Sequence, residues 1–131
     1  MLPLNSLTSS PLAACLSGLE VDVTALTGTA NLCCPADFPG FAGHFPNEPI
    51  LPAVMQLLAV RLLVEAVAQT PLVVVAVERL KFKGMVRPGE EVVVQVKLLV
   101  GAGRIKADFS LRRMGAAVAS GTVFFRIGEG A

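Results

Sequence analysis

Tryptophan and tyrosine are absent from this chain of 131 residues, and histidine occurs once, at His44. Without Trp and Tyr, recognition of bases by aromatic stacking is poorly served. The net charge of +1 gives no electrostatic reason for binding nucleic acid or an anionic membrane. A single histidine also argues against a metal site with several ligands, so no metal is expected.

Cysteine is scarce as well: Cys15, Cys33 and Cys34 are an odd number and contain no Cys-x-x-Cys pair. They therefore predict neither a disulfide framework nor a zinc site, and free thiols fit a reducing compartment. The first 15 residues lack the positive start and continuous apolar core of a secretion signal. No window reaches the ~20 uninterrupted apolar residues of a membrane span. A cytoplasmic protein is expected.

Apolar residues, by contrast, are abundant. They make up 53% of the chain, against 16% charged residues. The length is that of one ordinary domain, so we expect a single domain over 1–131, with an irregular lead-in over 1–18. The excess of apolar residues also suggests that some apolar surface is buried in an oligomer.

Proline is concentrated in one segment, directly before a long apolar stretch. The segment 35–52 contains five prolines, whose fixed φ angles and missing N–H groups predict a loop. Residues 53–68 follow directly and are apolar nearly all round, which predicts one long helix buried on most sides. Gln69-Thr70-Pro71 should end it.

The remaining chain has the patterns of strands. One strand is expected before the loop, over 19–34, with an interruption at Thr27-Gly28-Thr29. Short turns separate four further expected strands, which cover residues 72–83, 91–100, 104–112 and 116–127. One helix followed by a run of strands indicates an α+β domain in which an antiparallel sheet curls around the helix.

His44 stands in the loop just before the helix. Histidine has an unperturbed pKa of ~6.5, so it can accept or release a proton near neutral pH. In a proline-stiffened loop at a helix entrance it is a candidate catalytic base. The alternative is a core histidine that satisfies a backbone group.

The residues around His44 decide between these readings. His44-Phe45-Pro46, followed by Pro49, Pro52 and an apolar helix, resembles the 3-hydroxyacyl–acyl carrier protein dehydratases of the FabA/FabZ type. The stretch 80–90 (LKFKGMVRPGE) is similar to the strand and Pro-Gly-acid turn of these enzymes, and 119–123 (ASGTV) is a weaker match. The segment 51–57 (LPAVMQL) is most similar to the branch that acts in aryl polyene assembly.

The resemblance implies the hotdog fold, in which a curled antiparallel sheet wraps around one long buried helix. It implies a dimer, or a larger oligomer, that acts without a cofactor on an acyl thioester carried by acyl carrier protein or coenzyme A, in fatty acid or polyene synthesis. His44 would remove a proton from C2 of the substrate. The backbone N–H of Ala53 would polarise the thioester carbonyl, where the family usually has glycine. The implied substrate-binding residues are Phe45, Pro46, Ile50, Pro52 and Val54.

The catalytic acid departs from the family pattern. The family's Asp or Glu falls 14 residues after the histidine, on the helix of the partner subunit, and this chain has Leu58 there. Losing a positioned general acid typically lowers a rate by ~10²–10⁴. Whether the chain is an enzyme by itself is therefore open.

Three nearby residues are possible replacements. Glu65 projects close to the direction of Leu58, but lies ~10 Å further along a regular helix and can pair with Arg61 instead. Gln56 points ~160° away from Leu58 and can orient a water or hydroxyl, although an amide is no acid. Glu48 lies in the loop, where a solvated turn residue is the simpler interpretation.

Three functions remain open at this stage. The first is a dehydratase-like protein, and the second is an incomplete subunit that needs a carboxylate-bearing homologue or only binds acyl chains. The third is a hotdog thioesterase, although the His-Phe-Pro loop is not typical of those enzymes. Basic residues over 81–87 and 104–113 could contact an acidic carrier protein, or could form a solvated strand face.

Overall fold

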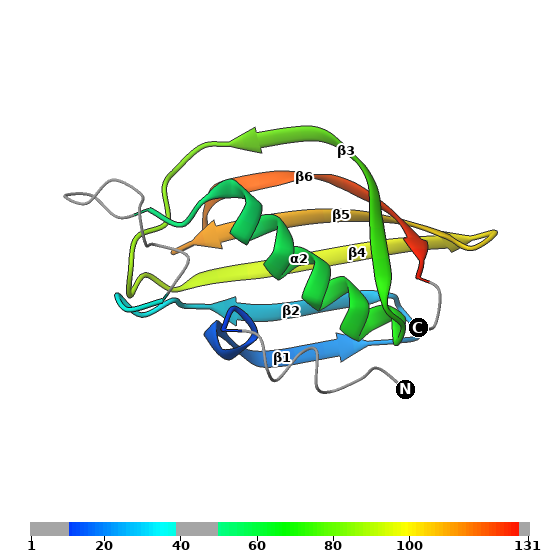
Figure 1. The fold of residues 1–131 in the computed structure, drawn as a ribbon, viewed down its shortest axis with the longest axis horizontal. Helices are drawn as coiled ribbons and strands as arrows, with labels where there is room; N and C mark the ends of the chain where they lie inside the picture. The colour runs from blue at the N-terminus through cyan, green and yellow to red at the C-terminus, as the bar shows by residue number, and fades with distance from the viewer. Residues whose placement is uncertain (1–10, 39–49, 129–131) are drawn as a thin grey trace.

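A computed structural model describes residues 11–38 and 50–128 of the chain. One helix, α2 (Ala53–Ala68), crosses the inner face of an antiparallel sheet of six strands (Figure 1). The strands are β1 (Leu16–Asp22), β2 (Thr27–Leu32), β3 (Leu72–Phe82), β4 (Val92–Gly101), β5 (Arg104–Arg113) and β6 (Ala116–Ile127). A short 3₁₀ turn, η1 (Ala13–Cys15), precedes β1.

The helix has the bounds that the sequence predicts. It begins after Pro52, whose extended backbone caps the first turn, and it ends at Gln69, which takes the left-handed conformation with φ 58°. Nearly all residues from Ala59 to Val67 are buried, because the sheet curls around this part of the helix. Its first turn is different, since the side chain of Val54 is 59% exposed. Within this single chain, the predicted burial is therefore confirmed from Ala59 to Val67, whereas the first turn of the helix is exposed.

The strand order is β1-β2-β4-β5-β6-β3, so β1 and β3 form the two edges of the sheet. β3 follows the helix directly in sequence, but it crosses to the far edge and pairs with β6 (Figure 1). Two register shifts interrupt this pairing, and Arg79 within the second one has φ 55°. Since β3 has a neighbour on one side only, its other edge is free in the described part of the chain.

The strands after the helix follow the sequence prediction closely. β5 buries Ile105, Ala107, Phe109 and Leu111 on its inner face, as its alternation predicts. The short turns expected between these strands are confirmed, and they fall at Ala102-Gly103 and Met114-Gly115, where all four residues have positive φ. Positive φ at both central residues is the geometry of tight hairpin turns that match the twist of the strands.

The prediction for the first strand is wrong. Residues 19–34 do not form one strand interrupted at Thr27-Gly28-Thr29, because that tripeptide begins β2 and the chain reverses at 23–26. The carboxylate of Asp22 holds this turn by accepting hydrogen bonds from the N–H groups of Thr24 (3.0 Å) and Ala25 (2.8 Å). β1 also begins at Leu16, inside the predicted irregular lead-in.

Candidate active site

The entrance of α2 forms one side of a cavity of about 230 Å³, called here the helix-entrance pocket. Its wall consists of Ile50, Leu51, Pro52, Ala53, Gln56, Phe82, Gly84 and Met85. The N–H of Leu51 donates to the carbonyl of Val86 at 2.7 Å, which joins the segment before the helix to the loop after β3. Backbone pairing therefore fixes the two walls of the pocket relative to each other.

The first turn of α2 has two unpaired backbone donors, and one of the two residues, Ala53, belongs to the wall of this pocket. In the described part of the chain, no acceptor pairs with the N–H groups of Ala53 and Val54, and the first turn contains no acidic residue. The N-terminus of a helix carries a partial positive charge, so these donors favour an oxygen that gains negative charge. Ala53 is exposed, which leaves its N–H accessible to a ligand.

Gln56 adds a buried polar group to the same pocket. Its side chain is 4% exposed, and its Nε2 donates to the carbonyl of Leu51 at 3.1 Å. Its Oε1 is buried and has no hydrogen-bond partner among the described residues. An unpaired buried acceptor costs about 1–3 kcal/mol, so Oε1 needs a hydrogen-bond partner that the described residues do not supply.

Leu58 lies in a different cavity, of about 190 Å³, called here the β3 pocket. Its lining is entirely aliphatic and comprises Val54, Leu57 and Leu58 from the helix, Val74 and Val77 from β3, and Val123 from β6. Among these residues there is no proton donor. The helix thus separates Gln56 from Leu58, as the predicted angle between the two side chains requires.

Glu65 is occupied by structural contacts at the other end of the helix. Its Oε2 accepts a hydrogen bond from the N–H of Leu72 at 2.8 Å, at the start of β3. Its Oε1 lies 4.0 Å from Nε of Arg61, which confirms the predicted pair. The carboxylate is buried in these contacts, so it is not available at the helix entrance.

The structure brings together some of the predicted site residues and not others. Ile50, Pro52, Ala53 and Gln56 share the helix-entrance pocket, whereas Val54 and Leu58 line the β3 pocket. The remaining predicted residues lie outside the described residues: His44, Phe45, Pro46 and the alternative acid Glu48. Their contribution to the site stays a prediction.

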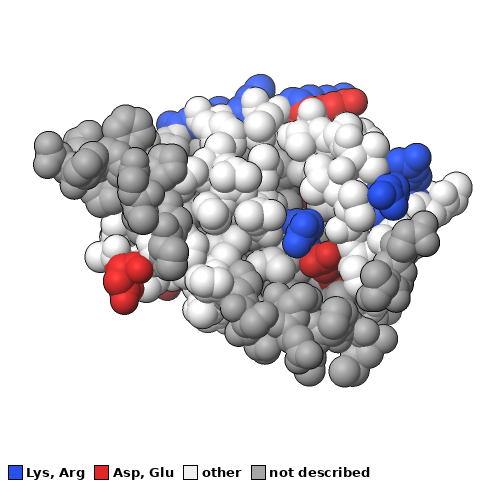
Figure 2. Space-filling model, in the orientation of Figure 1, with Lys and Arg blue, Asp and Glu red and all other residues white. Residues whose placement is uncertain are grey.

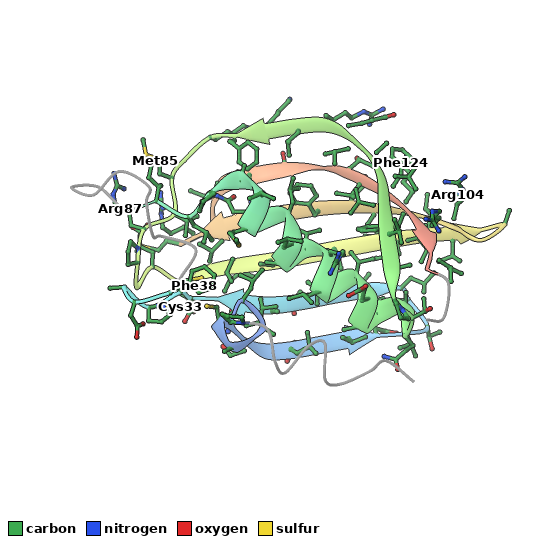
Figure 3. The ribbon with its side chains drawn as sticks, viewed as in Figure 1. Cys33, Phe38, Met85, Arg87, Arg104 and Phe124 are labelled. Carbon is green, nitrogen blue, oxygen red and sulfur yellow. The ribbon has the colours of Figure 1, made fainter. Side chains whose placement is uncertain are left out.

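Sequence reasoning missed the opposite wall of the helix-entrance pocket. Phe82 ends β3, and Gly84 and Met85 follow it in the loop that leads to β4. Figure 3 shows Met85 and Arg87 at the end of the molecule where α2 begins, and Arg104 and Phe124 at the opposite end. The signal was available, because the stretch 80–90 resembled the family, but no site role was assigned to it.

The three cysteines do not line the helix-entrance pocket. All three are free thiols, and Cys15 and Cys34 are buried. Burial raises the pKa of the Cys34 thiol far above its ordinary value, and the neighbouring Cys15 adds to the effect. A thiol held in its protonated form is a poor nucleophile, so Cys34 is a core residue.

A curled antiparallel sheet around one helix is the hotdog fold, and solved structures confirm this class. The dehydratase heterocomplex ApeI:P from Xenorhabdus doucetiae matches with a TM-score of 0.66 and 19% identity, over 78% of this chain and 88% of that one. A virulence protein from Campylobacter jejuni matches with a TM-score of 0.71 and 9% identity, over 88% and 85%. At these identities the likeness concerns the fold alone.

Sequence comparisons identify the family. The model of the ApeI-like family, described as ApeI dehydratase, matches residues 21–122. The 3-hydroxyacyl-[acyl-carrier-protein] dehydratase FabZ of Streptococcus thermophilus is 31% identical over 126 residues, which cover 85% of this chain and 83% of that protein. The FabZ of Syntrophobacter fumaroxidans is 30% identical over 100 residues, and the chain spans 62% of its length. The chain therefore belongs to the FabA/FabZ-type dehydratase family with the hotdog fold, in its ApeI-like branch.

In the described residues, no helix combines the length and the apolar character that crossing a membrane would require.

Proposed function

We propose that this chain is the base-bearing subunit of a 3-hydroxyacyl thioester dehydratase whose catalytic acid comes from another polypeptide. One observation carries the proposal. The helix entrance offers free N–H groups and a buried acceptor at Gln56, whereas Leu58, at the position of the family's acid, lies in a wholly aliphatic pocket. The chain thus has the polar half of a dehydratase site and lacks the acidic half.

In the proposed reaction, His44 removes a proton from C2 of the substrate, and the electrons of that C–H bond form the C2–C3 double bond. The N–H of Ala53, at the positive end of the helix, stabilises the negative charge that develops on the thioester oxygen. The C3–O bond breaks, and the departing hydroxyl receives a proton from the partner's carboxylic acid and leaves as water. The side chain of Gln56, which belongs to the wall of the same pocket, would contact the 3-hydroxyl and orient this group toward the acid.

The partner would bind along the free edge of β3. Ten of the eleven residues of this strand are exposed, from Val73 to Phe82, and many of them are large and apolar. Figure 2 shows a broad surface over α2 and β3 with few charged groups, bordered by Lys, Arg and acidic residues along its upper rim. An exposed apolar edge strand favours pairing with a strand of another chain. A second copy would bring only another Leu58, so we propose a carboxylate-bearing homologue of the same fold.

The substrate would arrive on an acyl carrier protein, as the name of the related FabZ enzymes states for them. Lys81, Lys83 and Arg87 are exposed beside the helix-entrance pocket and suit an acidic carrier. Arg113 differs from them, because it is engaged with Glu90.

The aliphatic β3 pocket supports a second candidate function. A cavity of about 190 Å³ without a polar side chain can hold part of an acyl chain without any chemistry. The chain would then be a non-catalytic subunit that binds acyl groups. This function predicts acyl thioester binding, but no turnover with any partner.

A test of the proposal compares turnover of 3-hydroxybutyryl-N-acetylcysteamine by three samples: the chain alone, its Leu58→Glu variant, and the chain co-expressed with a carboxylate-bearing homologue. We expect little turnover by the chain alone and a gain of at least 10-fold in the other two, since a positioned acid contributes ~10²–10⁴. Leu57→Glu places the same carboxylate on the neighbouring residue and is the matched control, which should gain nothing.

His44→Ala in the co-expressed complex completes the test, and it should lower turnover at least 100-fold. If the chain alone reaches the rate of the complex, the proposed shared acid is wrong. If no sample turns over while calorimetry detects binding of the thioester, the acyl-binding function is the better account.

A further inference from the structure

The loop between β3 and β4, residues 83–91, is held by four backbone hydrogen bonds to three other segments of the chain. The N–H groups of Lys83 and Gly84 donate to the carbonyl of Val118 in β6, at 2.7 and 3.2 Å. Further along, the N–H of Leu51 donates to Val86, and the N–H of Gly89 donates to the carbonyl of Cys34 at 2.8 Å. The loop therefore bridges the sheet, the entrance of α2 and the segment that follows β2.

A single side chain closes the middle of this loop. Nη1 of Arg113, the last residue of β5, donates to the carbonyl of Met85 and to Oε1 of Glu90, the latter at 3.1 Å. The same Glu90 oxygen accepts a hydrogen bond from the N–H of Arg87 at 2.7 Å. The guanidinium and the carboxylate thus connect residues 85, 87 and 90 in one network, called here the Arg113–Glu90 network.

The network lies directly behind the wall of the helix-entrance pocket. Gly84 and Met85 line the pocket, and Arg113 donates a hydrogen bond to the carbonyl of Met85. A Cβ atom on Gly84 would lie 3.5 Å from Nη2 of Arg113, so the guanidinium is in van der Waals reach of this part of the loop. The side chain of Met85 itself is 49% exposed at the pocket. Neither Arg113 nor Glu90 lines the pocket.

We propose that Arg113 is a positioning residue, which, with Glu90, fixes the Gly84–Met85 wall so that the pocket is preformed for the thioester. This inference rests on the proposed function, because it assigns the helix-entrance pocket to the substrate. Both side chains are about one-third exposed, 31% and 32%, so solvent screens their attraction and the pair adds little to global stability. Its effect is local order: without it, a larger part of the binding free energy is spent on ordering the loop.

Such a role affects substrate binding more than the chemical step. In the co-expressed complex, Arg113→Met should raise KM for 3-hydroxybutyryl-N-acetylcysteamine about 5- to 20-fold and change kcat less than threefold. Arg113→Lys retains one charged group that can donate to one of the two acceptors, so its KM should fall between that of the unmodified chain and that of Arg113→Met. Glu90→Gln should raise KM less than Arg113→Met, because the amide oxygen can still accept from Arg87.

Matched variants separate this local effect from a general loss of charge. Arg126→Met removes an exposed arginine from β6, and Glu91→Gln alters the exposed neighbour of Glu90. Both should leave KM within twofold of the unmodified chain. A fall in kcat at constant KM for Arg113→Met, or equal effects of Arg113→Met and Arg126→Met, would overturn the inference.

Hydrogen exchange of the same variants measures the network without any turnover. Arg113→Met should raise the exchange of the N–H groups of Leu51 and Arg87 at least 10-fold and leave the amides of β4 and β5 unchanged. Unchanged protection at Arg87 would overturn the inference even if the complex is active. Faster exchange in a complex that shows no turnover would support the loop-fixing role and count against the proposed dehydration instead.

Discussion

Gly28 allows the helix to approach the sheet, and replacing it by alanine should therefore destabilise the fold. Gly28 lies in β2, and a Cβ atom there would meet Cγ2 of Val67 at 2.7 Å and Cδ1 of Leu63 at 3.2 Å. Carbon atoms in ordinary contact are ~3.5–4.0 Å apart, so the first distance is too short by about 1 Å. Both helix residues are buried, and a valine in a helix has essentially one χ1 rotamer, which prevents an easy escape.

The magnitude follows from two opposing contributions. Overpacking a tight core costs about 1–3 kcal/mol, and the rigid neighbour at Gly28 favours the upper half of that range. Replacing glycine also reduces the entropy of the unfolded chain, which returns about 0.4–1 kcal/mol. The net loss should be about 1.5–2 kcal/mol. For a domain of 131 residues this lowers Tm by roughly 5–10 °C.

Thermal unfolding followed by circular dichroism, at one fixed protein concentration, measures this shift. Gly101→Ala is the matched control, because a Cβ atom there meets nothing within 4 Å and its φ is not left-handed. Its Tm should stay the same or rise slightly. If Gly28→Ala is as stable as Gly101→Ala, the helix does not pack against β2 as closely as the structure indicates.

Three further predictions concern the carboxylate of Glu65, the free edge of β3 and the thiol of Cys34. Glu65→Gln should keep turnover of the co-expressed complex within about twofold, because the carboxylate of Glu65 is engaged in structural contacts. Glu65→Leu should lower the free energy of unfolding in urea by about 1–3 kcal/mol, because it leaves the N–H of Leu72 unpaired. Loss of activity in Glu65→Gln at unchanged stability would contradict this. Val77→Arg should abolish association with the homologue in size-exclusion chromatography. Leu99→Arg also replaces an exposed apolar residue by arginine, but on β4, and should leave the association intact. Equal effects of the two variants would place the interface elsewhere. The raised pKa of Cys34 means that, as the pH rises, the thiol loses its proton in the unfolded chain before it does so in the folded one. The free energy of unfolding should therefore fall as the pH rises through the ordinary thiol value of 9.0, and Cys34→Ala should remove this contribution. An identical pH profile in the variant would contradict the raised pKa of Cys34.

The second half of the fold could be predicted because its signals are local. Proline precedes the helix, apolar residues cover it on all sides, and clean alternation marks the residues of β5. The hairpin of β1 and β2 lacks such signals, since no glycine or proline stands in its turn at 23–26. Gly28, two residues after this turn, suggested a break in the strand. Its actual reason is the close approach of Val67, a contact between residues far apart in the sequence that no local pattern reveals.

Part of the candidate site was likewise predictable from local geometry, and part depended on the topology of the sheet. Helix geometry alone predicted that Gln56 and Leu58 face apart, and the structure places them in separate pockets. The wall formed by Phe82, Gly84 and Met85 required knowledge of how β3 crosses to the far edge of the sheet, which depends on the topology and not on periodicity. The catalytic role of His44 stays a prediction, because this residue lies outside the described residues.

The free edge of β3 also has a consequence for the life of this protein in a cell. A newly made chain without the proposed partner subunit displays a row of valines and unpaired backbone groups, which is a template for aggregation. The register shifts and the charged residues Glu78, Arg79 and Lys81 on the same strand oppose such growth. We expect the orphan chain to be recognised by chaperones and proteases. Its abundance would then follow that of its partner, so that synthesis of the two subunits in equal amounts becomes a requirement for their accumulation.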